Sequence, residues 1–463
     1  MTTGFASLPL SSATLDNLVQ LGYTEMTPIQ AQSLPLILEG KDLIAQARTG
    51  SGKTAAFGLG IMHSLNPAWF GVQALVLCPT RELSEQVALE IRRLARAVDN
   101  IKVLTLCGGT PIRPQLESLQ HGAHIIVATP GRLLDHLERG SVDFTGLRTL
   151  VLDEADRMVD MGFYKDIAVI ANACPRKRQT LLFSATYPDS IRKASARFLN
   201  RPIEIKVEST LHASHAEQIF YEIRPDQRLE AVARLLQHFQ PVSTLAFCNT
   251  KARVRDLTQE LSRLGFSALA LHGDLDQRER EDVLVQFANQ SCSVLVATDV
   301  AARGLDIQTL DAVINVDVTQ DTEVHIHRIG RTGRGSEKGL ALNLASPDEM
   351  RWVDLIEQYL GTALHWQPLK QLKAAQGRRM SAPMVTLCIQ GGKKDKLRPG
   401  DLVGALTKDA GLSFDHLGKI NVFEFVTFIA VKREIANDAL ERLAGVNIKG
   451  RRFKARFMSP DGA

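Results

Sequence analysis

The sequence predicts an α/β protein with two tandem doubly wound lobes and a C-terminal α+β domain. Short apolar runs bounded by Gly, Pro or Asp alternate with helical patterns, which is typical of parallel strands covered on both faces. A polar stretch, Glu208–Glu217, interrupts this alternation once, and it then restarts. The last eighty or so residues instead show the order βαββαβ.

The first lobe is predicted to span residues 1–207. Its expected strands are Leu43–Ala45, Ala74–Cys78, Val103–Cys107, Ile125–Ala128, Thr149–Leu152 and Thr180–Phe183. Helical patterns such as Thr80–Ala97 and Pro114–Leu119 lie between them. Strands alternating with helices predict a doubly wound sheet.

The second lobe is predicted over residues 208–370, followed by a basic linker over 371–382. Its expected strands are Thr244–Phe247, Ala268–Leu271, Val294–Ala297, Ala312–Val316 and Leu340–Leu344. Its helical patterns include Arg228–Phe239, Arg253–Leu264 and Arg278–Phe287.

The terminal domain is predicted over residues 383–463. Strands are expected at Met384–Ile389, His416–Val422, Phe425–Val431 and Arg452–Phe457, and helices at Pro399–Ala410 and Arg433–Ala444. This order is that of the split βαβ fold.

Composition excludes a disordered chain, because 44% of the residues are hydrophobic. No run of eighteen apolar residues and no basic segment followed by an apolar stretch is present, so we expect a cytoplasmic protein without a membrane span. The six cysteines are scattered without a CxxC pair. Buried free thiols are therefore expected rather than a metal site or disulfides.

The charge is unevenly placed. Residues 377–463 carry 16 Lys and Arg against 9 Asp and Glu, whereas the remainder carries 39 against 42. A basic end on a slightly acidic body indicates binding to a polyanion, although a lysine-rich solvated surface explains the charge equally well.

A phosphate-binding loop is predicted between the strand Leu43–Ala45 and a helix that begins near Lys53. Gly50 and Gly52 let backbone N–H groups turn toward phosphate oxygens, Lys53 should reach the β- and γ-phosphates, and Thr54 should ligate Mg²⁺. Ala47 stands where the commonest pattern has glycine, so the strict motif fails by one residue. A glycine-rich turn without nucleotide is the alternative.

An acidic pair, Asp153 and Glu154, follows an apolar strand. Asp153 would hold Mg²⁺, mainly through water, and Glu154 would orient and deprotonate the attacking water. Acidic pairs after strands are also common helix caps. Together with Lys53, however, the pair predicts nucleotide hydrolysis.

Tyr23 and Gln30 precede the phosphate loop in the segment GYTEMTPIQ. The Gln30 amide matches the donors and acceptors at the edge of adenine, and Tyr23 could stack on its face. The residues alone fit an ordinary helix start with a packed tyrosine at least as well.

The chain resembles the DEAD-box ATP-dependent RNA helicases, which have two RecA-like lobes. Nine motifs occur in the order of that family: TPIQ (Thr27–Gln30), ARTGSGKT (Ala47–Thr54), PTREL (Pro79–Leu83), Gly108–Gly109, TPGR (Thr129–Arg132), DEAD (Asp153–Asp156), SAT (Ser184–Thr186), ATDVAARGLDI (Ala297–Ile307) and HRIGRTGR (His327–Arg334).

This resemblance implies an ATP site shared by the two lobes. The residues implied to bind ATP are Tyr23, Glu25, Gln30, Ala47, Arg48, Thr49, Gly50, Ser51, Gly52, Lys53, Thr54 and, at the ribose, Asp306. Arg331 and Arg334 match the arginines that touch the γ-phosphate. Ser184, Thr186, Asp156 and His327 match residues that couple ATP to RNA, and Arg328 would tie its segment to neighbouring motifs.

The resemblance also implies an RNA track across both lobes. Its residues are Pro79, Thr80, Arg81, Gly109, Thr129, Pro130, Gly131, Arg132, Thr250, Gly273, Arg280, Thr298 and Asp299. Small polar and backbone groups should read phosphates and 2′-hydroxyls, so binding would select RNA without reading its sequence. For Arg81 and Arg132, an exposed ion pair is the alternative.

The terminal domain resembles an RNA-recognition fold but lacks the aromatic motif on its third strand and a stacking aromatic on VTLCIQ, its first. We therefore expect its edges and loops to hold phosphates through Lys393, Lys394, Lys396, Arg451, Arg452 and Lys454. A protein–protein module is the alternative. Family members with this tail recognise a 23S ribosomal RNA hairpin near the peptidyl-transferase centre, which implies pre-ribosomal particles as partners.

The motifs thus predict an RNA-dependent ATPase that uses ATP and Mg²⁺ to separate short duplexes, and the resemblance implies that it acts during assembly of the large ribosomal subunit. A translocating DNA helicase and a non-catalytic RNA chaperone are the rivals. The TPIQ element opposes the first, and the complete phosphate-binding set opposes the second.

Overall fold

The computed structural model describes residues 4–47, 50–187, 192, 195–207, 216–302, 310–333, 339–373 and 381–458. The chain divides into two compact units, residues 1–210 with 304–306 and residues 211–303 with 307–463. The second unit holds both the second lobe and the terminal domain. The domain boundaries drawn from the sequence stay predictions.

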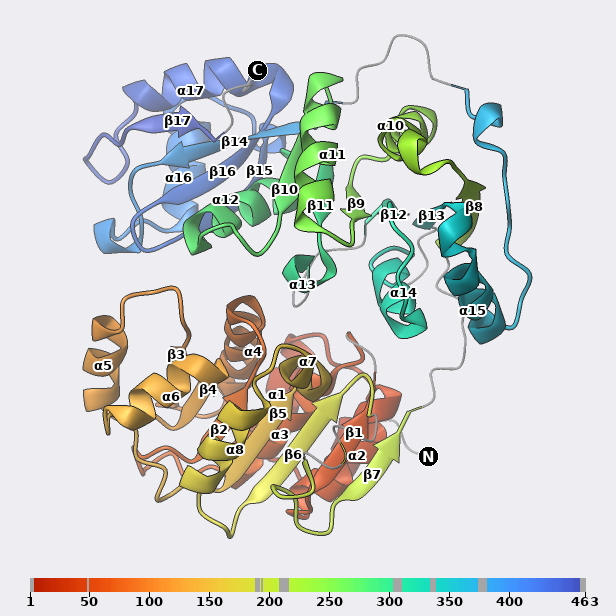
Figure 1. Cartoon of the computed structure of the whole chain (residues 1–463). Coiled ribbons are helices and arrows are strands. Elements are labelled where there is room, and N and C mark those ends of the chain that lie inside the picture. Colours follow the sequence, from red (N-terminus) through yellow and green to blue (C-terminus); the bar gives the residue numbers. More distant parts are fainter. Residues whose placement is uncertain are drawn as a thin grey trace. The chain divides into compact units, whose positions relative to one another are not determined.

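The first lobe is a parallel seven-stranded sheet in the order β3-β4-β2-β5-β6-β1-β7 (Figure 1). Its strands are β1 (Leu43–Gln46), β2 (Ala74–Leu77), β3 (Val103–Leu106), β4 (Ile125–Ala128), β5 (Thr149–Asp153), β6 (Gln179–Ser184) and β7 (Ile203–Lys206). Its helices are α1 (Ser12–Gln20), α2 (Pro28–Leu38), α3 (Lys53–Ser64), α4 (Arg81–Leu94), α5 (Arg113–Gln120), α6 (Pro130–Glu138), α7 (Ala155–Asp160) and α8 (Tyr164–Ala173).

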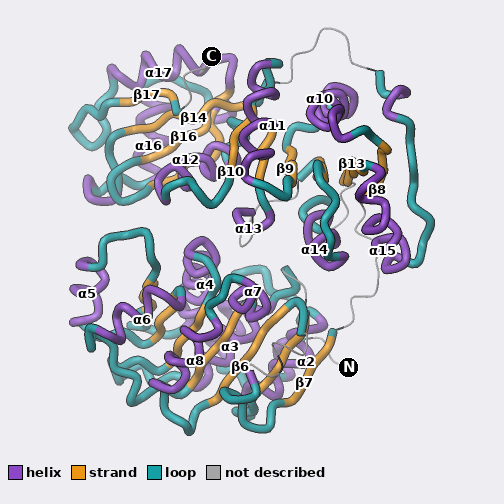
Figure 2. The backbone as a smooth tube through the Cα atoms, viewed as in Figure 1, coloured by secondary structure: helices purple, strands orange, loops and turns teal. Residues whose placement is uncertain are grey.

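The second lobe is a parallel six-stranded sheet in the order β10-β11-β9-β12-β13-β8. Its strands are β8 (Ala216–Glu222), β9 (Thr244–Phe247), β10 (Ala268–Leu271), β11 (Val294–Ala297), β12 (Ala312–Asn315) and β13 (Gly339–Ala345). Its helices are α10 (Arg228–Phe239), α11 (Lys251–Arg263), α12 (Gln277–Ala288), α13 (Asp299–Ala302), α14 (Thr322–Ile329) and α15 (Met350–Leu360). Figure 2 shows helices and strands alternating in both lobes.

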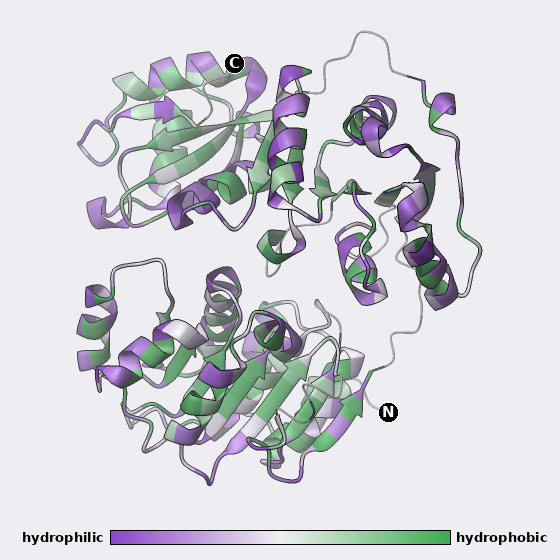
Figure 3. Cartoon of the chain, viewed as in Figure 1, coloured by the Kyte–Doolittle hydropathy of each residue, from purple (hydrophilic) through white to green (hydrophobic). Residues whose placement is uncertain are grey.

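Apolar strand residues build the core on both faces of each sheet, and Figure 3 shows the strands of the first lobe as its most hydrophobic part. Successive residues of β2 point to opposite faces: Ala74 and Val76 join one buried cluster, and Leu75 and Leu77 join another. All six cysteines are buried free thiols, as predicted.

Two edge strands were missed. β7 has only Ile205 buried, and β8 begins at Ala216, inside the stretch interpreted as linker. β7 alternates apolar and polar residues and lacks the continuous apolar run that identified the inner strands. β8 contains a short buried apolar run, Ile219–Tyr221, but it directly follows the polar stretch that was interpreted as a linker.

The terminal domain has the predicted βαββαβ order and an antiparallel sheet, β15-β16-β14-β17. Its elements are β14 (Met384–Ile389), α16 (Pro399–Gly404), β15 (Leu417–Val422), β16 (Thr427–Lys432), α17 (Ala436–Gly445) and β17 (Ala455–Phe457). The predicted helix Pro399–Ala410 continues after α16 as a π-helical turn, Ala405–Asp409. Together the three sheets confirm the fold class.

Candidate functional site

The phosphate loop lies between β1 and α3. Gly50 and Gly52 have φ angles of 80° and 92°, and a Cβ on Gly52 would lie 2.5 Å from Nε2 of Gln30. Both backbone conformation and space therefore require glycine at position 52. Lys53 is buried, and its Nζ donates to the Ala47 carbonyl at 3.0 Å.

Asp153 ends β5 beside this loop and is 3% exposed. Among the described residues, its Oδ1 has no hydrogen-bond partner. Burial raises the pKa of Asp153 to about 7, although the charge of Lys53 lowers it. A buried carboxylate oxygen without a partner would be satisfied by a hydrated divalent cation, so Asp153 and Thr54 fit Mg²⁺.

Glu154, the next residue of this motif, is held in a defined orientation. Glu154 adopts left-handed backbone angles, φ 55° and ψ 51°, which are uncommon for a residue with a side chain. Its carboxylate accepts from Nη1 of Arg157 at 2.8 Å. Strained backbone of this kind is often found at functional positions.

Asp156 joins the acidic motif to the SAT motif. Its Oδ2 accepts from the backbone N–H of Ala185 at 3.2 Å and from that of Thr186 at 3.0 Å, while the Asp156 N–H donates to Oγ of Ser184 at 3.2 Å. Oγ1 of Thr186 also donates to Oδ2 of Asp156. The structure therefore brings together the residues predicted to couple ATP to RNA within this lobe.

The candidate adenine-binding residues lie before the loop. Gln30 is buried; its Oε1 accepts from the Thr27 N–H at 2.9 Å, and its Nε2 donates to the Gly52 carbonyl at 3.0 Å. One amide hydrogen and one lone pair remain for a ligand. The hydroxyl of Tyr23 donates to Glu90 at 2.6 Å, while burial and this bond raise its pKa. This bond fixes the orientation of the Tyr23 ring, and Glu25 is exposed; the nucleotide roles of both residues stay predictions.

The strand order sorts the first-lobe motifs into two groups. Because all strands are parallel, every loop at their carboxyl ends lies on one edge of the sheet. The loops after β5, β6 and β1, which are neighbours, carry the candidate nucleotide residues. The loops after β3, β4 and β2 carry the candidate RNA residues Pro79, Thr80, Arg81, Gly109, Thr129, Pro130, Gly131 and Arg132.

Several of these RNA candidates shape their loops. Thr80 caps α4 by accepting from the Leu83 N–H, and Gly109 has a φ of 77°. Nη2 of Arg132 donates to the Thr110 carbonyl at 2.8 Å, and its side chain is 13% exposed. Its Nε also lies 3.9 Å from Oδ2 of Asp135, so Arg132 makes an ion pair but is itself largely buried, and its RNA role stays a prediction.

The second lobe repeats this arrangement. Thr250 caps α11, Gly273 follows β10, and Thr298 and Asp299 follow β11, so three neighbouring strands again present the RNA candidates. Nη2 of Arg280 donates to the Ala301 carbonyl at 2.7 Å.

Arg328 is 1% exposed and connects several loops of the second lobe. Its guanidinium donates to both carboxylate oxygens of Asp299, at 2.7 and 2.6 Å, and to Oδ1 of Asn249 at 2.9 Å. Arg328 thus has the connecting role implied for it. Arg331 is buried and His327 is partly buried. Arg48, Thr49, Asp306 and Arg334 lie outside the described residues.

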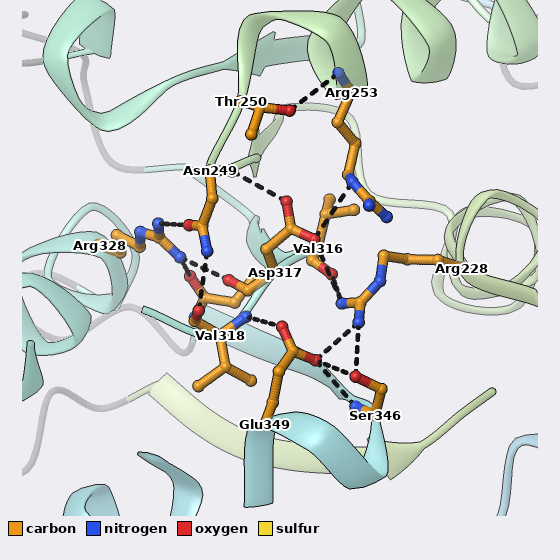
Figure 4. A network of polar contacts seen from close by, with 11 residues as sticks. Arg228, Asn249, Thr250, Arg253, Val316, Asp317, Val318, Arg328, Ser346 and Glu349 are labelled. Carbon is orange, nitrogen blue, oxygen red and sulfur yellow. Dashed lines mark hydrogen bonds and ion pairs between the residues drawn. The ribbon is translucent and has the colours of Figure 1, made fainter. Parts of the chain in front are cut away.

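A buried ionic network beneath these loops was not predicted (Figure 4). Nη2 of Arg228 donates to Glu349 at 2.6 Å, and its Nη1 lies 3.4 Å from Asp317. Burial raises the pKa of Glu349, but hydrogen bonds from Arg228 and Ser346 bring it below its ordinary value. Asp317 also accepts from the Asn249 N–H at 2.9 Å. No sequence pattern links these distant positions.

The basic residues of the terminal domain form one surface, here called the basic edge: Lys393, Lys394, Lys396, Lys449 and Arg451. All five are exposed. Nζ of Lys449 donates to the Lys396 carbonyl at 2.7 Å, and Arg451 lies 3.8 Å from Asp395, so two separate turns meet. Arg452 and Lys454 are also exposed.

One face of the terminal sheet is covered by the second lobe. Cys388 and Phe428 cluster with Val285 of α12 and are 5% and 4% exposed. The hydroxyl of Thr386 lies 3.2 Å from Nδ2 of Asn289 and 2.6 Å from Oγ of Ser291. RNA therefore has no access to this part of the sheet, which agrees with the expectation that edges and loops bind it.

Comparisons with known proteins identify the family. Models described as "DEAD/DEAH box helicase", "Helicase conserved C-terminal domain" and "DbpA RNA binding domain" match residues 27–194, 227–336 and 386–457. The chain is 51% identical to the ATP-dependent RNA helicase DbpA of Escherichia coli K12, over 98% of this chain and 100% of that protein. The chain belongs to the DEAD-box ATP-dependent RNA helicases.

Other DEAD-box proteins are also similar to this chain. The helicase CshA of Geobacillus kaustophilus is 44% identical over 77% of this chain and 76% of its own. The structure of S. cerevisiae Dbp5 bound to RNA and ADP BeF3 matches with a TM-score of 0.72 at 28% identity, covering 80% of this chain and 96% of that one. Both the two-lobed fold and its use of ATP and RNA are thus those of the family. None of the described helices is both long and apolar enough to cross a membrane.

Proposed function

We propose that this DEAD-box helicase is an RNA-stimulated ATPase that locally separates short duplexes, and that its terminal domain directs it to 23S ribosomal RNA during assembly of the large ribosomal subunit. The observation that carries this proposal is the shared sheet edge, where the phosphate loop and acidic motif lie beside the candidate RNA loops. Identity to E. coli DbpA along the whole chain supports the ribosomal target, a hairpin near the peptidyl-transferase centre in pre-ribosomal particles. Such a substrate implies a cytoplasmic location.

Each residue of the nucleotide site has a proposed task. Lys53 exchanges the Ala47 carbonyl for phosphate oxygens, and Glu154, oriented by Arg157, positions and deprotonates the attacking water. Bound Mg²⁺, held by Thr54 and Asp153, would neutralise phosphate charge. Arg331 and Arg334 would stabilise the charge that develops in the transition state, and Asp306 would contact the ribose.

Coupling to RNA is proposed to run through Asp156. Because Asp156 binds Ser184 and Thr186, a shift of the acidic motif on nucleotide binding is transmitted to the SAT motif. Joint binding of ATP and RNA would close the two lobes, bend one RNA strand and break its pairing. Hydrolysis would then reopen them.

The decisive experiment measures ATP turnover with ribosomal RNA, unrelated RNA and DNA side by side at one salt concentration. We expect strong stimulation by ribosomal RNA, weak stimulation by other RNA and none by DNA. Equal stimulation by DNA would favour the translocating DNA helicase. Deleting residues 377–463 should remove the preference for ribosomal RNA and leave the weak general stimulation; an unchanged preference would assign specificity to the lobes.

A further inference from the structure

A large aromatic side chain is exposed beside the basic edge. Phe425 lies at the tip of the β15–β16 hairpin and is 62% exposed. Its neighbours Phe423 and Val426 pack toward Cys388 and Phe428, so they help to cover the sheet face while Phe425 does not. The covered sheet face offers no aromatic ring to RNA at Phe428, which is 4% exposed.

The hairpin tip is held in place by the lysine turn. The N–H of Lys393 donates to the Phe423 carbonyl at 2.8 Å, and that of Lys394 donates to the Glu424 carbonyl at 3.0 Å. A Cβ on Gly392 would lie 2.4 Å from the Phe423 carbonyl oxygen, so only glycine allows this close approach. The turn and the tip therefore form one preorganised unit.

The charge of this turn lies against the aromatic ring. Nζ of Lys394 is 4.4 Å from the centroid of Phe425, within the range of a cation–π contact. Cationic groups next to a solvent-exposed aromatic ring are the combination that binds single-stranded nucleic acids, because phosphates and base faces are satisfied together. Glu424 places a carboxylate at the tip, so the basic edge rather than the tip would hold phosphates.

We propose that Phe425 and Lys394 form a stacking site for one unpaired RNA base, with the basic edge holding the flanking phosphates. This inference rests on the proposed function only in taking RNA as the ligand. It assigns the terminal domain a preference for loops and single strands, since a base inside an uninterrupted duplex has no open face to offer.

The test uses the full chain and a fluorescein-labelled RNA hairpin with an unpaired loop, compared with an uninterrupted RNA duplex. Phe425→Ala should weaken hairpin binding about five- to hundredfold, leave duplex binding unchanged and keep the same salt dependence. The matched control is Phe414→Ala, because Phe414 is 66% exposed in the same domain but lies in a different turn, Phe414–His416, before β15. Phe425→Trp should retain hairpin binding, and its indole emission should fall with hairpin and not with duplex.

Equal hairpin affinities for the Phe425→Ala and Phe414→Ala variants would overturn the proposal, and would leave Phe425 as a contact for a protein. Unchanged indole emission in Phe425→Trp would overturn it as well. RNA-stimulated ATP turnover of the wild-type chain is measured on the same preparations. Its absence would refute the proposed function, whereas the affinity comparison would still decide the role of Phe425.

Discussion

The two lobes share one strand order, but the buried aspartate near the end of the fifth strand has different neighbours in each lobe. With β7 set aside, β1 to β6 and β8 to β13 occupy the same positions in their sheets. Asp153 at the end of β5 leaves Oδ1 without a partner among the described residues. Asp317, just after β12, lies 3.4 Å from both Arg228 and Arg253.

This difference separates the proposed Mg²⁺ ligand of the first lobe from a structural support in the second. In the second lobe, arginines of the chain itself neutralise the buried carboxylate. In the first lobe, Lys53 compensates only partly, and the pKa of Asp153 stays high at about 7. Equivalent acidic positions of the two lobes can thus have different roles, ligand binding for Asp153 and stability for Asp317.

The largest expected effect concerns the chemistry, for which the first lobe is proposed to supply the general base. Glu154→Gln should lower RNA-stimulated ATP turnover about 10²- to 10⁴-fold, because the amide cannot accept the proton of water. Binding of a fluorescent ATP analogue should persist. Glu217→Gln on β8, an exposed position, is the control. Turnover retained in Glu154→Gln would refute its assignment as the base.

The next effect concerns stability of the second lobe. Arg228→Ala removes the arginine that binds buried Glu349 and one of the two arginines beside Asp317, so it should lower the free energy of unfolding by about 3–5 kcal/mol. Urea unfolding followed by circular dichroism measures this loss. Arg234→Ala removes an exposed pair with Glu230 on the same helix and should change stability by less than about 1 kcal/mol. Similar losses in both variants would contradict the structural role of the network.

A smaller effect of opposite sign is expected at Asp153. Its pKa is raised from 3.8 to about 7, so the folded state binds more protons than the unfolded state between these values and loses stability as pH rises through them. Asp153→Asn should therefore raise the free energy of unfolding of the ligand-free protein at pH 8 by at most roughly 4 kcal/mol. Its thermal midpoint should rise at pH 8 and change little at pH 4.

Differential scanning fluorimetry at the two pH values checks this prediction. Asp99→Asn, at an exposed position of the same lobe, serves as the control. A lower midpoint for Asp153→Asn at pH 8 would show that the ionised carboxylate stabilises the lobe without ligand.

The smallest expected effect concerns α5 and α12, each of which follows the third strand of its lobe. In α5 no residue is buried, whereas α12 buries Val285 against the terminal domain. Thr386→Val removes the hydroxyl that meets Asn289 and Ser291, at a loss of about 1 kcal/mol. Hydrogen exchange should then become faster in α12.

Thr258→Val is the matched control, because the Thr258 hydroxyl donates to Val254 within its own helix. Equal exchange rates in α12 for both variants would argue against the docking contact.

Inner strands were predictable from sequence because burial on both faces demands continuous apolar runs, as in β2 and β4. β7 was missed because it alternates apolar and polar residues, and β8 because its apolar run directly follows the polar stretch interpreted as a linker. The phosphate loop and acidic motif could be predicted because their spacing is local.

The buried network could not be predicted, since Arg228 and Glu349 are 121 positions apart and each fits an ordinary helix start. The docking of Thr386 was missed for the same reason: a lone threonine in a strand gives no sign of a distant partner. The nucleotide roles of Asp306 and Arg334 stay predictions.

The bond between Lys53 and the Ala47 carbonyl has a consequence for ligand choice. Any incoming molecule gains at Lys53 only the difference between its own bond and the one it displaces. A multiply charged phosphate group exceeds a neutral carbonyl by a wide margin, whereas a sugar hydroxyl or water does not. Adenosine and other uncharged mimics should therefore compete poorly, however well their base fits.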